Sequence, residues 1–342
     1  MITDLGVLPG NHITSFATGV NNLGEVTGVS QESSFSKRNG FYWSSSTGMV
    51  SIGSASTTIN FSQASSINAS GHIAGSSIAS TGFGNTNVAV KWDPISGMQV
   101  LTSMAGEESS FAWKINDSGQ IAGENVVGGI NQGFFWDSTM GKQRIGSLAG
   151  ANGSSSVSDM NNLGEIVGGS QNSSGGTEAY IWDSVNGMRS LSAILPSSLQ
   201  DFSVTDINDV GDFLGGAVVN FQARQFHYSA SAGLHLIDGL SGISGNTLLN
   251  EVNNVGVAVG SHGSNAIIWD AINGTQNLND LKVGTTNNLL DAQSISDTGF
   301  IAGSMTVGTQ THAYLATPVP EPASMIGLSA LGLLVIRRRK KN

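Results

Sequence analysis

The sequence lacks cysteine and is poor in proline and in charged residues. Without cysteine, disulfide bonds and thiolate metal sites are excluded throughout the 342 residues. Only 6 residues are proline and 11% are charged, against about a quarter charged in an average globular domain. Glycine is abundant, with 46 residues, and 39% of the chain is hydrophobic, which is enough to bury a core. This composition is typical of short strands joined by tight turns, and it suits an extracellular surface.

The few charges are unevenly placed. Of the 14 basic residues, five form the run 337–341, and of the 24 acidic residues only Glu321 lies near that run, so residues 1–316 carry a net charge of −14. A surface of this sign is repelled by phosphate backbones, which argues against a nucleic-acid partner.

One short pattern recurs seven times: an apolar residue, Asn, two variable residues, Gly, and a second Gly four residues later. The spacing of Asn and the first Gly predicts a hairpin turn in which that Gly adopts a positive φ. The second Gly predicts a strand position crowded by a neighbouring backbone. In the seventh copy Ser296 replaces Asn, and the copies, 43 to 48 residues apart, begin at Val20, Ile67, Ile115, Met160, Ile207, Val252 and Ile295.

A second pattern, an aromatic residue followed by Asp and then Gly, lies about 23 residues after each first one and predicts another hairpin. Each repeat therefore reads as four strands. In the second repeat these are expected at 63–67, 72–77, 88–92 and 98–104, with the longest link at 78–87. The aromatic residues of this pattern are Trp43, Trp92, Trp136, Trp182, Tyr228 and Trp269.

Four strands in about 45 residues is the spacing of a β-propeller blade. The seventh repeat lacks a fourth strand, and residues 1–8 resemble the fourth strand of other repeats. We therefore predict that residues 1–316 form an all-β, seven-bladed propeller closed by the N-terminal strand, which removes the exposed sheet edges. Another β-repeat form, such as a β-helix, is the main alternative.

Residues 317–342 differ from the repeats. A Pro-Glu-Pro motif precedes an apolar stretch at 323–336, which we expect to form a short transmembrane helix. The basic run that follows should arrest transfer and stay in the cytoplasm. The alternative is a plain tail anchor. The motif residues are Val319, Pro320, Glu321 and Pro322, and the stop-transfer residues are Arg337, Arg338, Arg339, Lys340 and Lys341.

This tail resembles the PEP-CTERM sorting signal of Gram-negative bacteria, with all three of its parts present. The resemblance implies export, processing by the membrane protease and transpeptidase called exosortase near the Pro-Glu-Pro motif, and a host that makes exopolysaccharide. It therefore implies a membrane-anchored precursor that becomes a cell-surface or extracellular protein. Residues 1–316 resemble the HAF family of extracellular repeats, through the Asn-x-x-Gly turns and the segments 179–182 and 266–269. The histidine that names that family survives only at His312.

Such proteins begin with a signal peptide, whereas Met1-Ile2-Thr3-Asp4 has neither a basic start nor an apolar run. Met1 aligns with strand residues such as Met49 and Met98. We therefore expect the assigned start to be internal, with a signal peptide upstream.

Candidate sites are few. The six histidines show no metal-ligand spacing, and no cofactor is expected. The repeat register of the tryptophans indicates blade packing, but Trp113 lies outside that register and is the better candidate for a ligand contact. Aspartates recur beside turns, which indicates turn capping rather than a calcium ring or a carboxylate pair. They are Asp117, Asp209 and Asp297 in one register and Asp93, Asp137, Asp183 and Asp270 in the other.

These features favour an exported, non-catalytic surface or matrix protein that binds polysaccharide or surface partners. The alternative is a glycoside hydrolase or lyase that acts on exopolysaccharide. Its catalytic groups would come from residues that break the repeat, namely Glu107, Glu108, Glu178 and Arg224.

Overall fold

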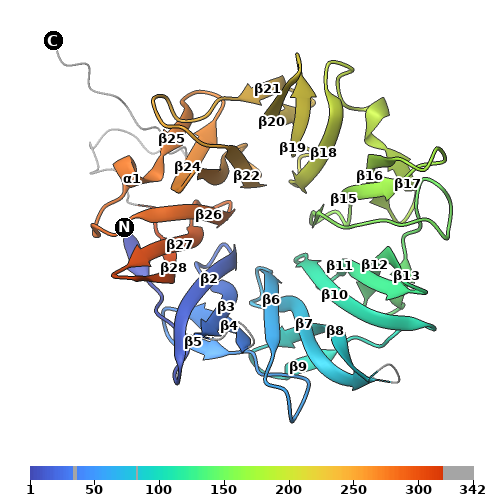
Figure 1. Ribbon diagram of the computed structural model, residues 1–342, viewed down its shortest axis with the longest axis horizontal. Helices are drawn as coiled ribbons and strands as arrows, with labels where there is room; N and C mark the ends of the chain where they lie inside the picture. Colours follow the sequence, from blue (N-terminus) through green and yellow to red (C-terminus); the bar gives the residue numbers. More distant parts are fainter. Residues whose placement is uncertain (34–36, 82–83, 319–342) are drawn as a thin grey trace, which may run out of the picture.

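A computed structural model describes residues 1–33, 37–81 and 84–318. These residues form seven four-stranded antiparallel sheets arranged as blades around a central axis (Figure 1). The chain is therefore an all-β, seven-bladed propeller, as the repeat spacing predicts.

In the first six blades the strands follow chain order from the axis outward. Blade 1 contains β2 (His12–Val20), β3 (Val26–Glu32), β4 (Arg38–Ser44) and β5 (Gly48–Ser51), and blade 2 contains β6 (Ser62–Ile67), β7 (Ile73–Thr81), β8 (Gly84–Asp93) and β9 (Gly97–Val100). Blade 3 contains β10 (Glu107–Ile115), β11 (Ile121–Val127), β12 (Ile130–Asp137) and β13 (Gly141–Arg144), and blade 4 contains β14 (Asp159–Met160), β15 (Ile166–Gln171), β16 (Thr177–Asp183) and β17 (Gly187–Ser190). Blade 5 contains β18 (Gln200–Ile207), β19 (Phe213–Val219), β20 (Gln222–Ser229) and β21 (Gly233–Ile237), and blade 6 contains β22 (Thr247–Val252), β23 (Ala258–His262), β24 (Asn265–Asp270) and β25 (Gly274–Asn277).

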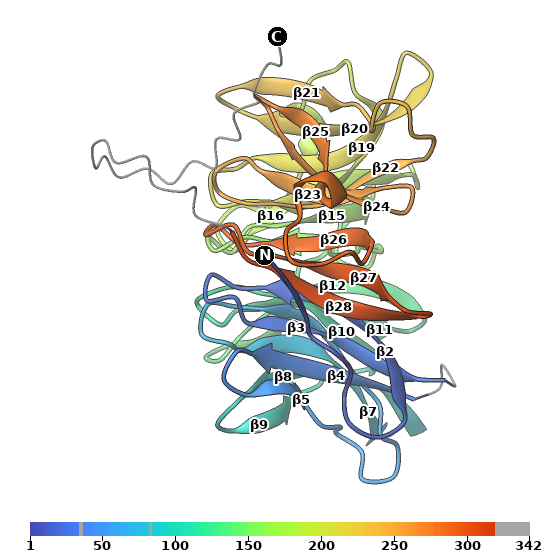
Figure 2. The same cartoon turned by 90° about the vertical axis from the view of Figure 1, so that its left-hand side faces the viewer.

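Blade 7 joins the two ends of the chain. Its inner strands are β26 (Leu289–Ile295), β27 (Ile301–Val307) and β28 (Gln310–Ala316), and its outer strand is β1 (Ile2–Asp4). Ile2 lies opposite Ala316, and the Met1 ammonium donates to the Thr317 carbonyl at 2.7 Å. Figure 2 shows the N-terminus beside this sheet. The predicted closure by the N-terminal strand is thus confirmed, although the strand is shorter than the segment 1–8.

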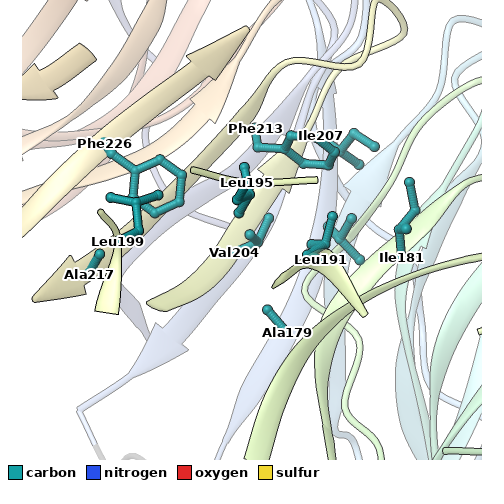
Figure 3. Packing of buried hydrophobic residues seen from close by; sticks show 11 residues of the cluster. Ala179, Ile181, Leu191, Leu195, Leu199, Val204, Ile207, Phe213, Ala217 and Phe226 are labelled. Atoms are coloured by element: carbon teal, nitrogen blue, oxygen red, sulfur yellow. The ribbon is translucent and has the colours of Figure 1, made fainter. Parts of the chain in front are cut away.

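The hydrophobic core is divided among the junctions between blades. Seven buried clusters lie in the described part of the chain, one at each junction. Figure 3 shows the cluster between blades 4 and 5, in which Leu191 and Phe226 are fully buried. At the closing junction, Leu5 and Leu8 pack with Phe41 of blade 1 and Leu315 of blade 7. Because every blade packs on two others, closing the ring removes the last exposed apolar face.

The two glycines of the repeat have the predicted roles. The first adopts a positive φ in every blade, from 74° at Gly24 to 85° at Gly299. The second lies on the second strand against the carbonyl of the first strand. A Cβ on Gly75 would lie 2.0 Å from the Gln63 oxygen, and one on Gly260 would lie 1.9 Å from the Leu248 oxygen. No other residue type fits at that distance.

Two details of the predicted second repeat are wrong. The segment 78–87 is not a long link, because β7 continues to Thr81 and β8 begins at Gly84. Both strands are longer than their apolar segments. The ends that meet at the turn are paired with each other but are half-buried or exposed, so they need no hydrophobic residues. The fourth strand ends at Val100 rather than at 104.

The described residues contain no helix long and apolar enough to cross a membrane. Their helices are the short η1 (Leu191–Ala193) and α1 (Leu278–Leu281). The predicted helix 323–336, the motif 319–322 and the basic run 337–341 lie outside the described residues.

We predict that Gly75→Ala lowers the free energy of unfolding by about 3 kcal/mol, because the new methyl group overlaps the Gln63 carbonyl and forces the strands apart. Gly176→Ala is the matched control, since its Cβ would be 3.6 Å from the nearest atom. Urea unfolding of both variants measures the difference. Equal unfolding midpoints would show that the close approach does not constrain the blade.

Candidate functional site: the axial channel

In six of the seven blades the inner strand places one residue against the axis by means of a β-bulge. In blade 2, Ala64 pairs with Gly75 and Ser66 pairs with Ala74, so Ser65 is the extra residue. Register shifts at the equivalent place occur in blades 1, 3, 5, 6 and 7. We call the extra residues, with Ser158 at the same repeat position of blade 4, the bulge ring: Thr18, Ser65, Trp113, Ser158, Thr205, Asn250 and Gln293.

The residue after each bulge forms a second layer, the post-bulge ring. Its side chains connect neighbouring blades. Asp159 Oδ2 accepts from the Ile207 N–H at 2.9 Å, and Asp206 Oδ2 accepts from the Val252 N–H at 2.7 Å. Ser294 Oγ accepts likewise from Val20 of blade 1 at 3.0 Å. The members of the post-bulge ring are Gly19, Ser66, Lys114, Asp159, Asp206, Glu251 and Ser294.

A third layer, the asparagine belt, surrounds the mouth of the channel. The Asn21 amide donates to the Asn68 carbonyl of the next blade at 3.0 Å, and the same bond is repeated around the ring as far as Asn253 and Ser296. At the last junction Thr298 donates through its hydroxyl to the Asn22 carbonyl. The repeated asparagine thus both shapes its own turn and connects its blade to the next.

Two adjoining cavities follow the axis through these layers. The mouth, about 170 Å³, is lined by the asparagine belt and the post-bulge ring. The larger cavity, about 380 Å³, is lined by the bulge ring together with Gln63, Val157, Lys114 and Glu251. Most of the groups that line the larger cavity are hydroxyls and amides, with one aromatic ring, that of Trp113. The two cavities share Thr18, Ser65, Lys114 and Glu251.

The charged residues of the channel are four members of the post-bulge ring and three aspartates at the mouth, Asp117, Asp209 and Asp297. Lys114 Nζ lies 2.8 Å from Asp159 Oδ1, and 27% of the Lys114 side chain is exposed to the channel. Asp206 and Glu251 occupy the same position of the ring on blades 5 and 6. The post-bulge ring therefore has one cation and three carboxyl groups on four consecutive blades, and blades 7, 1 and 2 contribute only serine and glycine to it.

Burial and mutual repulsion separate the acidities of these carboxyl groups. Burial alone would lower the pKa of Lys114, but the carboxyl groups of Asp159, Asp206 and Glu251 raise it above its usual range. Burial would raise the pKa of Asp159, but Lys114 and a backbone hydrogen bond lower it. Burial and the charge of Asp159 raise the pKa of Asp206 well above normal. Burial raises the pKa of Glu251 to about 7. At neutral pH the cluster thus combines one ion pair with two carboxyl groups that hold protons in whole or in part.

Trp113 is the one aromatic candidate from the sequence that lines the channel, and the aspartates Asp117, Asp209 and Asp297 line its mouth. Trp113 lines the larger cavity and stacks on Phe111, with ring centroids 5.5 Å apart and planes at 3°. Trp92, Trp182 and Trp269 are buried in the junctions between blades, and Trp43 and Trp136 pack against such clusters.

The acid and base candidates of the hydrolase alternative lie elsewhere. None of Glu107, Glu108, Glu178 and Arg224 lines either cavity. Glu107 forms a buried ion pair with Lys142 at 2.8 Å, Glu178 accepts from the Ser192 hydroxyl at 3.0 Å, and Arg224 pairs with Asp238 at 2.6 Å. The structure therefore does not bring these four residues together at the channel, and Glu107, Glu178 and Arg224 are instead paired within or beside their own blades.

The recurring aspartates cap turns in two different ways. Asp93 Oδ1 accepts from the N–H groups of Ile95 and Ser96 in its own turn. Asp117 instead accepts at 2.8 Å from the Ala69 N–H of the preceding blade. Among the described residues no group of three or more His, Asp or Glu is placed to hold a metal ion. The same cap within the residue's own turn is made by Asp137, Asp183 and Asp270. The cap of the preceding blade is made by Asp209 and Asp297.

Sequence reasoning missed Lys114, Asp159, Asp206 and Glu251. Their signal is positional: each stands immediately before the apolar residue that opens the first pattern. In the other three repeats that position holds Gly19, Ser66 or Ser294, so only an alignment of the seven copies against the bulge would have revealed the ring.

Comparison with protein families identifies the tail. Residues 318–341 match the family described as the PEP-CTERM protein-sorting motif. This signal implies exosortase-dependent export and sorting to the cell surface. The comparison with curated proteins yields no match.

Several solved structures are similar to the propeller in fold alone. The β-propeller domain of the Trilobed protease from Pyrococcus furiosus is 9% identical with a TM-score of 0.56, over 88% of this chain and 93% of that one. An oligogalacturonate lyase in complex with manganese is 9% identical with a TM-score of 0.55, over 94% and 93%. An acylaminoacyl peptidase from Pyrococcus horikoshii is 11% identical with a TM-score of 0.55, over 88% of this chain, which spans about half the peptidase's length (51%).

The raised pKa of Glu251 predicts a pH dependence of stability. The unfolded carboxyl titrates near 4.5 and the folded one near 7, so folding takes up a proton between these values. Stability therefore decreases as pH rises through that window and levels off above it. Glu251→Gln should remove this decrease, worth up to about 3 kcal/mol.

Urea unfolding at about pH 5 and at about pH 8 gives the free energy of unfolding on either side of this titration, and the difference between the two values measures the effect. Asp280→Asn, at an exposed side chain of α1, is the control and should behave as the wild type. Parallel pH profiles of the wild type and Glu251→Gln would refute the assignment.

Proposed function

We propose that the protein is a non-catalytic surface or matrix protein whose axial channel binds exopolysaccharide. The sorting signal directs it to the cell surface, where such polymers are found. The observation that carries the proposal is the 380 Å³ cavity of the bulge ring, which combines Trp113 with hydroxyl and amide side chains. A concave site with convergent polar groups and an aromatic ring is a candidate ligand site, and here the polar groups predominate, which favours a hydroxyl-rich ligand.

The chemistry of the cavity suits a sugar unit. Hydroxyl and amide side chains both donate and accept hydrogen bonds, as sugar hydroxyls do. Gln293, Ser158 and Thr205 line the cavity on three different blades, and Trp113 offers an aromatic surface for the apolar face of a pyranose ring. The excess of carboxyl groups disfavours uronic-acid polymers, so the proposed ligand is a neutral or amino-sugar segment.

The tail extends the proposal to the export and processing of the protein. Residues 323–336 would anchor the precursor, with the cations at 337–341 in the cytoplasm, because each costs about 2.5 to 3.5 kcal/mol at the centre of a membrane helix. Exosortase would then cleave near Pro320-Glu321-Pro322 and release the propeller to the surface. The seven blades would be HAF-type repeats in this scheme.

An enzymatic role is the alternative, and the post-bulge ring favours one location for it. Glu251, with its pKa of about 7, faces the larger cavity and is the group suited to exchange a proton with a bound polysaccharide during hydrolysis or elimination, whereas Lys114 stays charged beside it. Release of reducing ends or of unsaturated products, abolished by Glu251→Gln, would favour this role over simple binding.

We predict that Trp113→Ala weakens binding of the purified protein to exopolysaccharide about tenfold, the loss expected for one aromatic contact. Gln293→Ala should weaken it too, whereas Phe221→Ala, at a fully exposed position away from the channel, should not. Retention on immobilised polymer fractions, with thermal melting as the fold control, measures these effects. Unchanged retention of Trp113→Ala would move the site out of the channel.

A second prediction concerns processing. The protein recovered from the native cell surface should have an intact mass that lacks residues 323–342, because cleavage near Pro320-Glu321-Pro322 removes the anchor. Glu321→Ala should accumulate at full length in the membrane fraction. A surface protein that retains Arg337–Lys341 would refute cleavage and indicate a permanent tail anchor.

A further inference from the structure

Seven turn tips carry aliphatic side chains that are mostly exposed to solvent. Their exposed fractions run from 63% at Val210 to 95% at Ile95. The Asn-x-x-Gly turns contribute the inner tips and the aromatic-Asp turns contribute the outer tips. The inner tips are Leu23, Leu163, Val210 and Val255, and the outer tips are Ile95, Val185 and Ile272.

All of these tips lie on one face of the ring. Strands within a blade are antiparallel, so the turn after the first strand and the turn after the third strand lie at the same end. We call this end the hairpin face. Five of the seven tips lie on the consecutive blades 4, 5 and 6, and we call them the apolar arc: Leu163, Val185, Val210, Val255 and Ile272.

The chain leaves the propeller from the same face, next to this arc. β28 is the third strand of blade 7 and ends at Ala316 on the hairpin face. Thr317 is fixed there by its N–H, which donates to the Met1 carbonyl at 2.8 Å. Pro318 lies against the first turn of blade 7, since a Cβ on Gly299 would be 3.2 Å from its ring.

We propose that the hairpin face docks on the outer surface of the membrane that holds the precursor, with the aliphatic tips of blades 4 to 6 in the lipid interface. The proposal rests on the anchored precursor described above. The occupant follows from the length of the chain: five residue steps separate Pro318 from Ala323, the first residue of the apolar stretch. They span at most about 18 Å, so the anchor keeps the hairpin face of blade 7 within that distance of the bilayer, which favours this face as the one that meets the membrane.

The charges of the face determine which lipid it accepts. Slight burial would raise the pKa of Asp183, but hydrogen bonds from Asn186 and Val185 and the charge of Arg189 hold it below its usual value. Hydrogen bonds from Ile95 and Ser96 likewise keep Asp93 ionised. These carboxylates stand at the base of turns whose tips are apolar, so the face fits a zwitterionic lipid surface and is repelled by an anionic one.

The lack of cysteine allows a direct test with the full-length chain. Val185→Cys and Ile272→Cys on the hairpin face, and Phe221→Cys at the turn between β19 and β20 on the opposite face, are labelled with an environment-sensitive fluorophore. Each protein is reconstituted into phosphatidylcholine vesicles and floated on a density gradient. We expect co-flotation, blue-shifted emission at 185 and 272, and at least threefold weaker quenching by aqueous iodide there than at 221.

Two further arms identify the surface. Replacing part of the phosphatidylcholine with phosphatidylglycerol should restore iodide quenching at 185 and 272. Leu163→Ser combined with Val210→Ser should weaken the blue shift at 185 without preventing flotation.

The outcomes separate the two proposals. Flotation with equal quenching at 185, 272 and 221 overturns docking and leaves the anchor intact. Failure to float overturns the anchor and docking together. Protection at 185 that increases with protein density, or that persists in detergent without vesicles, indicates that a second copy covers the face and overturns docking on lipid.

Discussion

The architecture depends on one close contact, repeated in every blade: a carbonyl of the inner strand against a glycine of the second strand. A side chain at that glycine would overlap the carbonyl oxygen at about 2 Å, as the Cβ positions at Gly75 and Gly260 show. At the residue paired with the glycine, the inner strand bulges and turns its next residue toward the axis. The glycine therefore does more than permit a close approach. It sets the place where each blade presents a side chain to the channel.

The same local geometry connects the blades. The inner strand is the edge of its sheet, so backbone groups on its axial side have no partner strand, and the side chains of the adjacent blade satisfy them. Asp159 and Asp206 accept such N–H groups, and the Asn250 amide donates to the Ala292 carbonyl at 2.9 Å. Structure and candidate function thus share residues. The ring is uniform in backbone but unequal in side chains, with Trp113, Lys114 and Glu251 concentrated where other blades have serine, threonine or glycine.

Much of the fold could be predicted because its determinants are local. Positive-φ glycines, turn-forming asparagines and a missing fourth strand can all be read from short segments, and the number of blades and the closure follow from them. The channel residues could not be predicted, because the register between two strands decides which residue is extra. Lys114 resembles any variable lysine until Ala112 and Ala122 fix the bulge. The aspartates were recognised as caps, but a pattern within one repeat could not show that Asp117 caps Ala69 of another.

The closing strand also determines when the protein can finish folding. β1 precedes every other strand of the ring in the sequence, yet its partner β28 is the last strand, so the pairing of Asp4 with Tyr314 requires the strands of all seven blades to be present. Until then one blade has an open edge, and the cluster of Leu5, Leu8 and Leu315 cannot form. Contacts of such long sequence separation form slowly. The ring therefore acquires its final shape only when β28 is present, and a chain cut short before blade 7 keeps an open sheet edge.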